Sequence, residues 1–447
     1  MTRFLFLISF VVLCTSQTIS QAIAQTPTPA LPPVIDASPT LTPRGLAEQA
    51  QNQNAATTPT AAPLIPAKPV KDDLWERIRR GFAMPDLQDE FVTNREQWYV
   101  TRPDYIARMT ERSKKYLYHV VEELEARKMP TELALLPFIE SAFNPQAVSS
   151  AKAAGMWQFI PSTGRDYSLK QNTFRDDRRD VLASTRAALD YLQKLYGMFG
   201  DWHLALAAYN WGEGSVGRAI AKNQKLGLPT AYSDLKMPNE TRYYVPKLQA
   251  VKNIVASPEQ FNTQLGDIDN HPYFQSVPIT RDMDVDLAAK LADVPLADFK
   301  ALNPSLSRPV ILAAGTPQVL MPWGNAETFS RNLNNYSGQL ASWTAWTLPA
   351  ALKPQDAAKR VGMSESMLRE VNGIALKAGT IKAGSTLLVP RSAHKTDDVA
   401  AHVADNGQLT MFVPPKPKAK HKANNKTTRK AAPKATTTKQ RKTNVKK

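Results

Sequence analysis

The chain has 447 residues, a formal net charge of +16 and a single cysteine. Its length exceeds one ordinary domain and predicts two or three modules. Residues 411–447 contain eleven Lys, two Arg and no acidic residue, so they carry +13 and leave only +3 for the rest of the chain. The basicity therefore belongs to a tail, and the body of the protein is near neutral.

The first residues have the pattern of a cleavable export signal. Arg3 precedes an apolar run over residues 4–14, and an Ala-Ile-Ala cleavage sequence follows at 22–24. This run is too short to span a bilayer as a stable helix. We therefore predict a signal peptide over residues 1–24.

Removal of that segment would take away Cys14, the only cysteine. The mature chain would then have no disulfide and no thiol nucleophile. Lipid attachment at Cys14 is the alternative, although Val12 and Leu13 are larger than the residues such a site prefers. Membrane association has no other support in the sequence.

Residues 25–71 are rich in Pro, Thr, Ala and Gln, a composition that predicts an extended linker. From residue 72 to 262 apolar residues recur at helical spacing and strand patterns are scarce. We predict an all-α domain over 72–262, which includes one helix over 112–128 and another over 181–198.

Two later segments resemble each other. An Ala-Ala-Lys triplet at 288–290 leads after fifteen residues to Asn303 and then to Pro322, and the same triplet at 357–359 leads after fifteen residues to Asn372 and then to Pro390. The order helix, helix and strand, with a first strand in front, predicts small α+β (βααβ) modules. Their predicted ranges are 272–324 and 340–392, followed by a basic tail, disordered by composition, over 393–447.

Glu140 is the candidate for chemistry. It ends an apolar stretch, residues 135–139, and Phe143 follows it. Cleavage of a glycosidic bond needs a proton donor, and apolar surroundings keep a carboxyl protonated near neutral pH. Along the chain its nearest acids are Glu132 and Asp166, and neither has an obvious claim to the role of a nucleophile.

The segments around Glu140 resemble the motifs of the family 1 lytic transglycosylases, lysozyme-like enzymes that cut the glycan strands of bacterial peptidoglycan. The matching segments are Glu140-Ser141, Gly155-Met156-Trp157-Gln158, Ala208-Tyr209-Asn210 and Glu240-Thr241-Arg242-Tyr243-Tyr244-Val245. The resemblance implies an all-α lysozyme-like (SLT) catalytic domain in which Glu140 is the catalytic residue. It implies substrate-binding or orienting roles for Ser149, Gly155, Gln158, Tyr209, Asn210 and Tyr244.

Individual roles follow from this resemblance. Ser149 is expected near the substrate's acetamido group, with Ser150 as its substitute, and Gly155 is expected to let the backbone approach the glycan. Tyr209 is expected to donate a hydrogen bond that orients Glu140. Ordinary structural roles, such as a turn serine or a packed Trp-Gln loop, are the alternative for each residue.

The implied reaction cleaves the β-1,4 bond between MurNAc and GlcNAc without water and leaves 1,6-anhydro-MurNAc ends, with exo or endo action left open. A single acid suffices if the substrate's acetamido group supplies the second function. A goose-type lysozyme-like hydrolase and a non-catalytic peptidoglycan-binding scaffold are the alternatives. The six histidines have no metal spacing, and we expect no cofactor.

The two repeats resemble LysM modules, which bind glycans containing N-acetylglucosamine, although both lack the Gly-Asp-Thr-Leu signature. Generic α+β spacers are the alternative. For an exported enzyme of this family we expect a periplasmic location, or an outer-membrane lipoprotein if Cys14 is lipidated. The tail is expected to contact anionic cell-wall or lipopolysaccharide groups rather than nucleic acid, or to be merely solvated.

Overall fold

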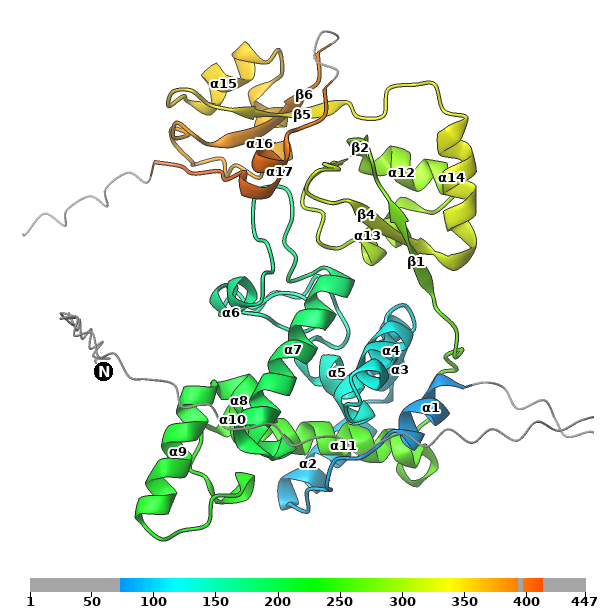
Figure 1. Ribbon diagram of the computed structural model, residues 1–447, viewed down its shortest axis with the longest axis vertical. Helices are drawn as coiled ribbons and strands as arrows, with labels where there is room; N and C mark the ends of the chain where they lie inside the picture. The colour runs from blue at the N-terminus through cyan, green and yellow to red at the C-terminus, as the bar shows by residue number, and fades with distance from the viewer. Residues whose placement is uncertain (1–72, 393–396, 413–447) are drawn as a thin grey trace, which may run out of the picture. The chain divides into compact units, whose positions relative to one another are not determined.

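The computed structural model describes residues 73–392 and 397–412 (Figure 1), so the predicted signal peptide and linker lie outside it. Up to residue 262 the described chain is helical, and the all-α prediction is confirmed. Its α-helices are α1 (Leu74–Arg80), α2 (Glu90–Val100), α3 (Pro103–Ser113), α4 (Leu117–Ala126), α5 (Leu136–Ser141), α6 (Pro161–Asp166), α7 (Val181–Phe199), α8 (Trp202–Trp211), α9 (Glu213–Lys225), α10 (Asn239–Arg242) and α11 (Tyr244–Ala256). Short 3-10 helices are η1 (Thr131–Leu135), η2 (Tyr232–Asp234) and η3 (Pro258–Phe261).

Aspartates start several of these helices. The side chains of Asp73, Asp89, Asp180 and Asp201 each accept a hydrogen bond from a backbone N–H in the first turn of α1, α2, α7 and α8. Such caps satisfy N–H groups that have no partner inside the helix. The amphipathic faces of these helices then bury one large core, with Trp75 and Trp157 fully enclosed.

The single helix predicted over 112–128 is wrong, because α3 ends at Ser113 and α4 begins only at Leu117. The buried Ser113 hydroxyl donates to the carbonyl of Thr110 at 2.7 Å, a local bond that competes with helix continuation. Tyr116 is also buried in the break, and its hydroxyl donates to the carbonyl of Ala301 at 2.8 Å. Tertiary contacts therefore interrupt a pattern that is periodic along the sequence.

The α+β prediction for the following region is also confirmed. In the first module β1 pairs antiparallel with β4, from Phe274 opposite Pro322 to Pro278 opposite Gln318. Its elements are β1 (Phe274–Pro278), β2 (Met283–Asp284), α12 (Val285–Leu291), α13 (Leu296–Leu302), β3 (Val310–Ile311), β4 (Gln318–Pro322), η4 (Trp323–Asn325) and α14 (Ala326–Asn334). Because Phe329 of α14 belongs to the same apolar core, the module continues past the predicted end at residue 324.

The second module repeats this plan with β5 (Trp343–Thr347), α15 (Pro354–Arg360), α16 (Glu365–Asn372) and β6 (Thr386–Pro390). Its antiparallel pair runs from Trp343 opposite Pro390 to Thr347 opposite Thr386.

One buried asparagine performs the same task in each module. The Asn303 amide accepts from the N–H of Leu320 and donates to the Leu320 carbonyl, both at 2.8 Å. Asn372 makes the same two bonds with Leu388, at 2.7 and 2.9 Å. The repeat seen in the sequence is therefore a repeat of hydrogen bonding between the second helix and the last strand.

The predicted start of the tail at residue 393 is wrong for residues 397–412, which are folded and include α17 (Ala401–Asn406). Thr386 N–H donates to the Gln408 carbonyl and Phe412 N–H to the Thr380 carbonyl, both at 2.8 Å, so the segment lies along the second module. Val399 and Ala404 are buried in an apolar cluster with Leu388, which anchors this stretch on the module. Within the described ranges no helix is long and apolar enough to cross a membrane.

Candidate active-site cleft

A cleft of about 510 Å³ opens among α5, α8, α11 and the loop after α5. Six of the seven residues implied by the resemblance line it: Glu140, Ser149, Gln158, Tyr209, Asn210 and Tyr244. They come from segments about a hundred residues apart, and the fold brings them to one cavity. The seventh, Gly155, does not line it.

Glu140 lies in the last turn of the six-residue helix α5. The helix ends because Ala142 and Phe143 adopt left-handed conformations, with φ of 51° and 53°. Their N–H groups donate back to the carbonyls of Phe138 and Pro137. The rings of Phe138 and Phe143 pack edge to face with their centroids 4.6 Å apart, and Ile139 lines the cleft beside the half-buried Glu140.

This environment sets the acidity of Glu140. Burial raises the pKa of the Glu140 carboxyl to about 7. Three neighbours modulate it: the hydroxyl of Tyr244 donates to Glu140 Oε1 and lowers the pKa, the charge of Lys247 lowers it, and the charge of Glu240 raises it. At neutral pH a large fraction of Glu140 can therefore hold a proton and still release it.

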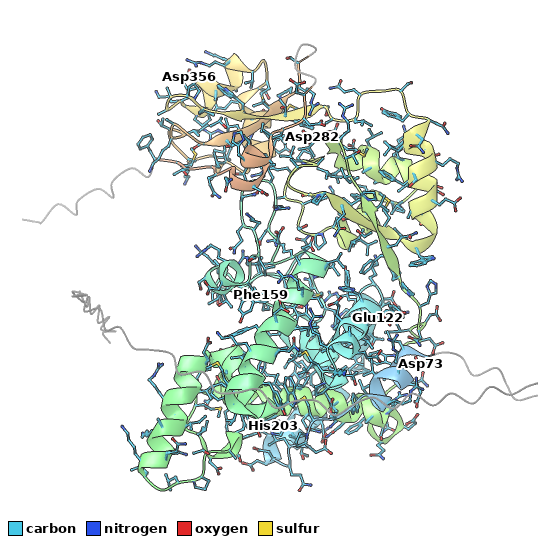
Figure 2. The ribbon with its side chains drawn as sticks, viewed as in Figure 1. Asp73, Glu122, Phe159, His203, Asp282 and Asp356 are labelled. Carbon is cyan, nitrogen blue, oxygen red and sulfur yellow. The ribbon has the colours of Figure 1, made fainter. Side chains whose placement is uncertain are left out.

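A tight loop presents Ser149 and Gln158, and Figure 2 labels the adjoining Phe159. Ser149 Oγ accepts from the N–H of Ala153 at 3.1 Å, which leaves its hydroxyl proton available to the cleft. The Gln158 amide donates to the carbonyl of Gly155 at 2.7 Å, which leaves its oxygen as an acceptor.

The expectation that Gly155 lets the backbone approach the glycan stays a prediction, and the close backbone approach seen in the structure is a different one. Gly155 has φ of 85°, and a Cβ added there would lie 1.9 Å from the carbonyl oxygen of Arg178. The close approach is therefore between two segments of the protein itself.

Tyr209 and Asn210 reach the cleft from the end of α8. The hydroxyl of Tyr209 donates to the carbonyl of Trp157 at 2.9 Å. It therefore steadies the loop that carries Gln158 and does not orient Glu140 as expected. Asn210 Oδ1 accepts from the hydroxyl of Thr241 at 2.8 Å, so its amide N–H groups remain free to donate within the described part of the chain.

The sequence assigns no role to three further cleft residues: Tyr191 on α7, Glu240 on α10 and Lys247 on α11. Glu240 belongs to a matching motif and is an exposed second carboxyl in the cleft, a hundred residues from Glu140 along the chain. Lys247 follows Tyr244 by three residues and so faces the same side of α11, a spacing that could have identified it. Tyr191 has no such signal in the sequence.

Glu132, by contrast, has a structural role. Its buried carboxylate accepts from the N–H groups of Ala83 and Met84 and pairs with Lys252 at 3.2 Å. Within residues 73–392 and 397–412, no group of His, Cys, Asp or Glu is arranged to hold a metal ion. The expectation of catalysis without a cofactor stays a prediction.

Comparison with known proteins identifies two families in the chain. Residues 120–228 match the Transglycosylase SLT domain, and residues 273–338 match the LysM-like domain of lytic transglycosylase MltD. The Pseudomonas aeruginosa lytic transglycosylase Slt, solved as an inactive mutant, is 20% identical over 34% of this chain and 26% of its own, with a TM-score of 0.23.

Two relatives show how far the similarity extends. Membrane-bound lytic murein transglycosylase C of Glaesserella parasuis is 30% identical over 168 residues, which cover 33% of this chain and 46% of the relative. Membrane-bound lytic murein transglycosylase D of Escherichia coli K12 is 35% identical over 361 residues, which cover 76% of this chain and 79% of the relative. This match spans both the helical domain and the modules, and by it the chain belongs to the family of membrane-bound lytic murein transglycosylase D.

Proposed function

We propose that the protein is a peptidoglycan lytic transglycosylase in which Glu140 serves first as acid and then as base. The observation that carries this proposal is a carboxyl with a pKa of about 7, held by Tyr244, in a cleft large enough for sugar rings. Membership of the family makes the glycan strands of peptidoglycan the substrate.

In the reaction Glu140 gives up one proton and recovers another. Glu140 donates its proton to the oxygen that links MurNAc C1 to GlcNAc, and the C1–O bond breaks while the acetamido oxygen closes on C1, so that GlcNAc leaves with this proton on its hydroxyl group. The Glu140 carboxylate then takes the proton of the C6 hydroxyl, and O6 attacks C1, displaces the acetamido oxygen and forms the 1,6-anhydro ring. Glu140 ends protonated, as it began, and no water enters the products.

Ser149, Gln158 and Asn210 supply the polar groups that would hold the sugar. The free hydroxyl proton of Ser149 and the free amide of Asn210 are donors, and the Gln158 oxygen is an acceptor. Tyr244 fixes the rotamer of Glu140. Tyr209 positions Gln158 indirectly, through its hydrogen bond to the carbonyl of Trp157.

Product mass and a Glu140→Gln variant test this assignment. Digestion of purified sacculi should yield fragments that are one water lighter than hydrolysis products, and the variant should lose activity by at least about a thousandfold. Glu240→Gln is the matched control and should keep most of the activity. Reducing-end products would establish the goose-type lysozyme-like hydrolase instead, and undiminished clearing by Glu140→Gln would support a scaffold whose cleft is not catalytic.

For location, the signal pattern of residues 1–24 and the membrane-bound relatives favour the cell envelope, where the enzyme would remodel the wall. Export into the periplasm is the finer proposal, with lipidation of Cys14 as its alternative. The basic tail would contact anionic cell-wall or lipopolysaccharide groups.

A further inference from the structure

A second surface with the chemistry of a sugar site lies at one end of the first module. It is a groove of about 460 Å³ whose lining includes Tyr273, Trp323, His271 and Asp269. Tyr273 and Trp323 are 37% and 48% exposed, unusually open for two large aromatic side chains in one groove. The ring of His271 meets that of Trp323 edge to face, with the ring centroids 5.3 Å apart.

The polar ends of these side chains are unused. Within the described residues, no group hydrogen-bonds to the hydroxyl of Tyr273 or the indole N–H of Trp323, and the exposed carboxylate of Asp269 has no cationic partner. The ammonium of Lys115 lies 5.9 Å from the centroid of the Tyr273 ring. An indole donor, a phenol and a carboxylate acceptor beside two partly exposed rings can satisfy a ligand rich in both hydroxyl groups and C–H faces. A pyranose ring is such a ligand.

The backbone beneath the two rings is rigid. They flank the first pair of the β1–β4 ladder, Phe274 opposite Pro322, and the N–H of Trp323 donates to the carbonyl of Tyr273 at 3.0 Å. The side chain of Gln275 donates to the carbonyl of Trp323 at 2.7 Å. The loops that join the strands to α12 and α13 leave from the other end of this ladder, at Pro278 and Gln318, so they do not form this surface.

The second module shows that the fold does not require aromatic residues here. Its corresponding pair is Trp343 opposite Pro390, which places Ser342 and Arg391 where the first module has Tyr273 and Trp323. The same backbone bond forms, from Arg391 N–H to the Ser342 carbonyl at 2.7 Å. Because a serine and an arginine form the same backbone hydrogen bond, the fold does not depend on the aromatic side chains of Tyr273 and Trp323.

We propose that Tyr273, Trp323 and Asp269 bind a stretch of the peptidoglycan glycan strand outside the catalytic cleft, with N-acetylhexosamine rings lying against the two aromatic side chains. This inference takes its ligand from the proposed function and adds a place to hold the strand. A strand held there stays bound after each cut in the cleft, which raises the effective concentration of the remaining substrate.

The test is co-sedimentation of the full chain, carrying Glu140→Gln to prevent digestion, with sacculi and with amidase-stripped glycan strands. Salt at about 0.3 M screens the basic tail. Tyr273→Ser with Trp323→Ala should weaken binding to both polymers by tenfold or more, and chitotetraose should compete with the parent but not with the variant. Tyr336→Ser removes an aromatic of similar exposure, 38%, and serves as control, whereas Trp323→Tyr should restore most of the binding.

Unchanged binding by the double variant would overturn the proposal. Loss on sacculi with no loss on stripped strands would overturn it as well, because the ligand would then be peptide. Thermal unfolding should be unaltered, since the rings are exposed. When Glu140 is left unchanged, the double variant should still cut a soluble muramyl tetrasaccharide to anhydro products. Failure of this site is therefore distinguishable from failure of the catalytic assignment.

Discussion

Glu140 takes its acidity from its surroundings, and two charges in the cleft act on it in opposite directions. Lys247 stabilises the carboxylate and Glu240 destabilises it. Since the first step needs the protonated acid, kcat/KM should fall as pH rises through about 7. Lys247→Met should raise the pKa and move this descending limb up by about half a pH unit, whereas Glu240→Gln should move it down by a similar amount.

Rate profiles on sacculi between pH 5 and 9 check this pair. Lys222→Met, on the distal part of α9, removes the same charge away from the cleft and should leave the limb in place. Limbs that shift in the same direction for both cleft variants would contradict the electrostatic account.

The buried position of Glu140 lowers the stability of the protein once its carboxyl loses the proton. The folded-state pKa of Glu140 is raised from 4.5 to about 7, so its favourable contribution is fully present below about pH 4.5 and is lost as pH rises through 7. Glu140→Gln should therefore raise the free energy of unfolding by roughly 3 kcal/mol at pH 8 and by much less at pH 5. Urea titrations at both pH values measure this difference, and an equal gain at both would assign it to packing.

Much of the cleft could be predicted, because short motifs carry Glu140, Gln158, Asn210 and Tyr244. Their roles stay predictions. The hydrogen-bond partner of the Tyr209 hydroxyl was not predictable from the sequence. Tertiary packing brings it to the carbonyl of Trp157 and not to Glu140. Lys247 was missed for a related reason: its link to Glu140 crosses more than a hundred residues of sequence.

At the scale of elements, the paired asparagines join helix to strand inside each module. Replacing Asn372 by Ala leaves the N–H and the carbonyl of Leu388 buried without a partner. The expected loss is about 3 kcal/mol of unfolding free energy, with a lower thermal midpoint for the second module.

Asn303→Ala should act in the same way on the first module, and exposed Asn334→Ala or Ser366→Ala should have little effect. Cutting of a soluble tetrasaccharide should persist in all of these variants. A neutral Asn372→Ala would mean that water replaces the amide.

The sequence predicts the ends of a helix where local caps determine them. It does not predict them where contacts with residues distant in sequence determine them. The ends of α7 were close to prediction, since Asp180 caps its start and Gly200 adopts φ of 66° at its end. The break between α3 and α4 depends on a contact from Tyr116 to Ala301, which no local pattern announces.

At the scale of the molecule, the segment 397–412 completes the second module. Ending the chain after residue 392 exposes the edge along Thr386 and removes Val399, whose N–H donates to the buried carboxylate of Asp282 at 2.8 Å. Ending it after residue 412 keeps these bonds. The shorter chain should unfold several degrees lower and aggregate more readily.

Calorimetry and light scattering compare the two truncations with the full chain. Equal midpoints for all three would show that residues 397–412 contribute nothing. The order of domains was predictable from composition and repeats, but a strand edge covered by a later segment was not, because its pattern is too short to stand out.

The two modules carry different side chains at the same end of their strands. Just beyond the first strand pair, both modules form the same backbone hydrogen bond. The first module exposes Tyr273 and Trp323 there, whereas Arg391 of the second forms an ion pair with Asp282. The first module can thus bind ligand at this end while the second stabilises the protein. This is possible because Asn303 and Asn372 hold helix and strand together inside each module, and the exposed side chains can differ. The two modules therefore share their internal hydrogen bonds and differ in the side chains at this end of the strands.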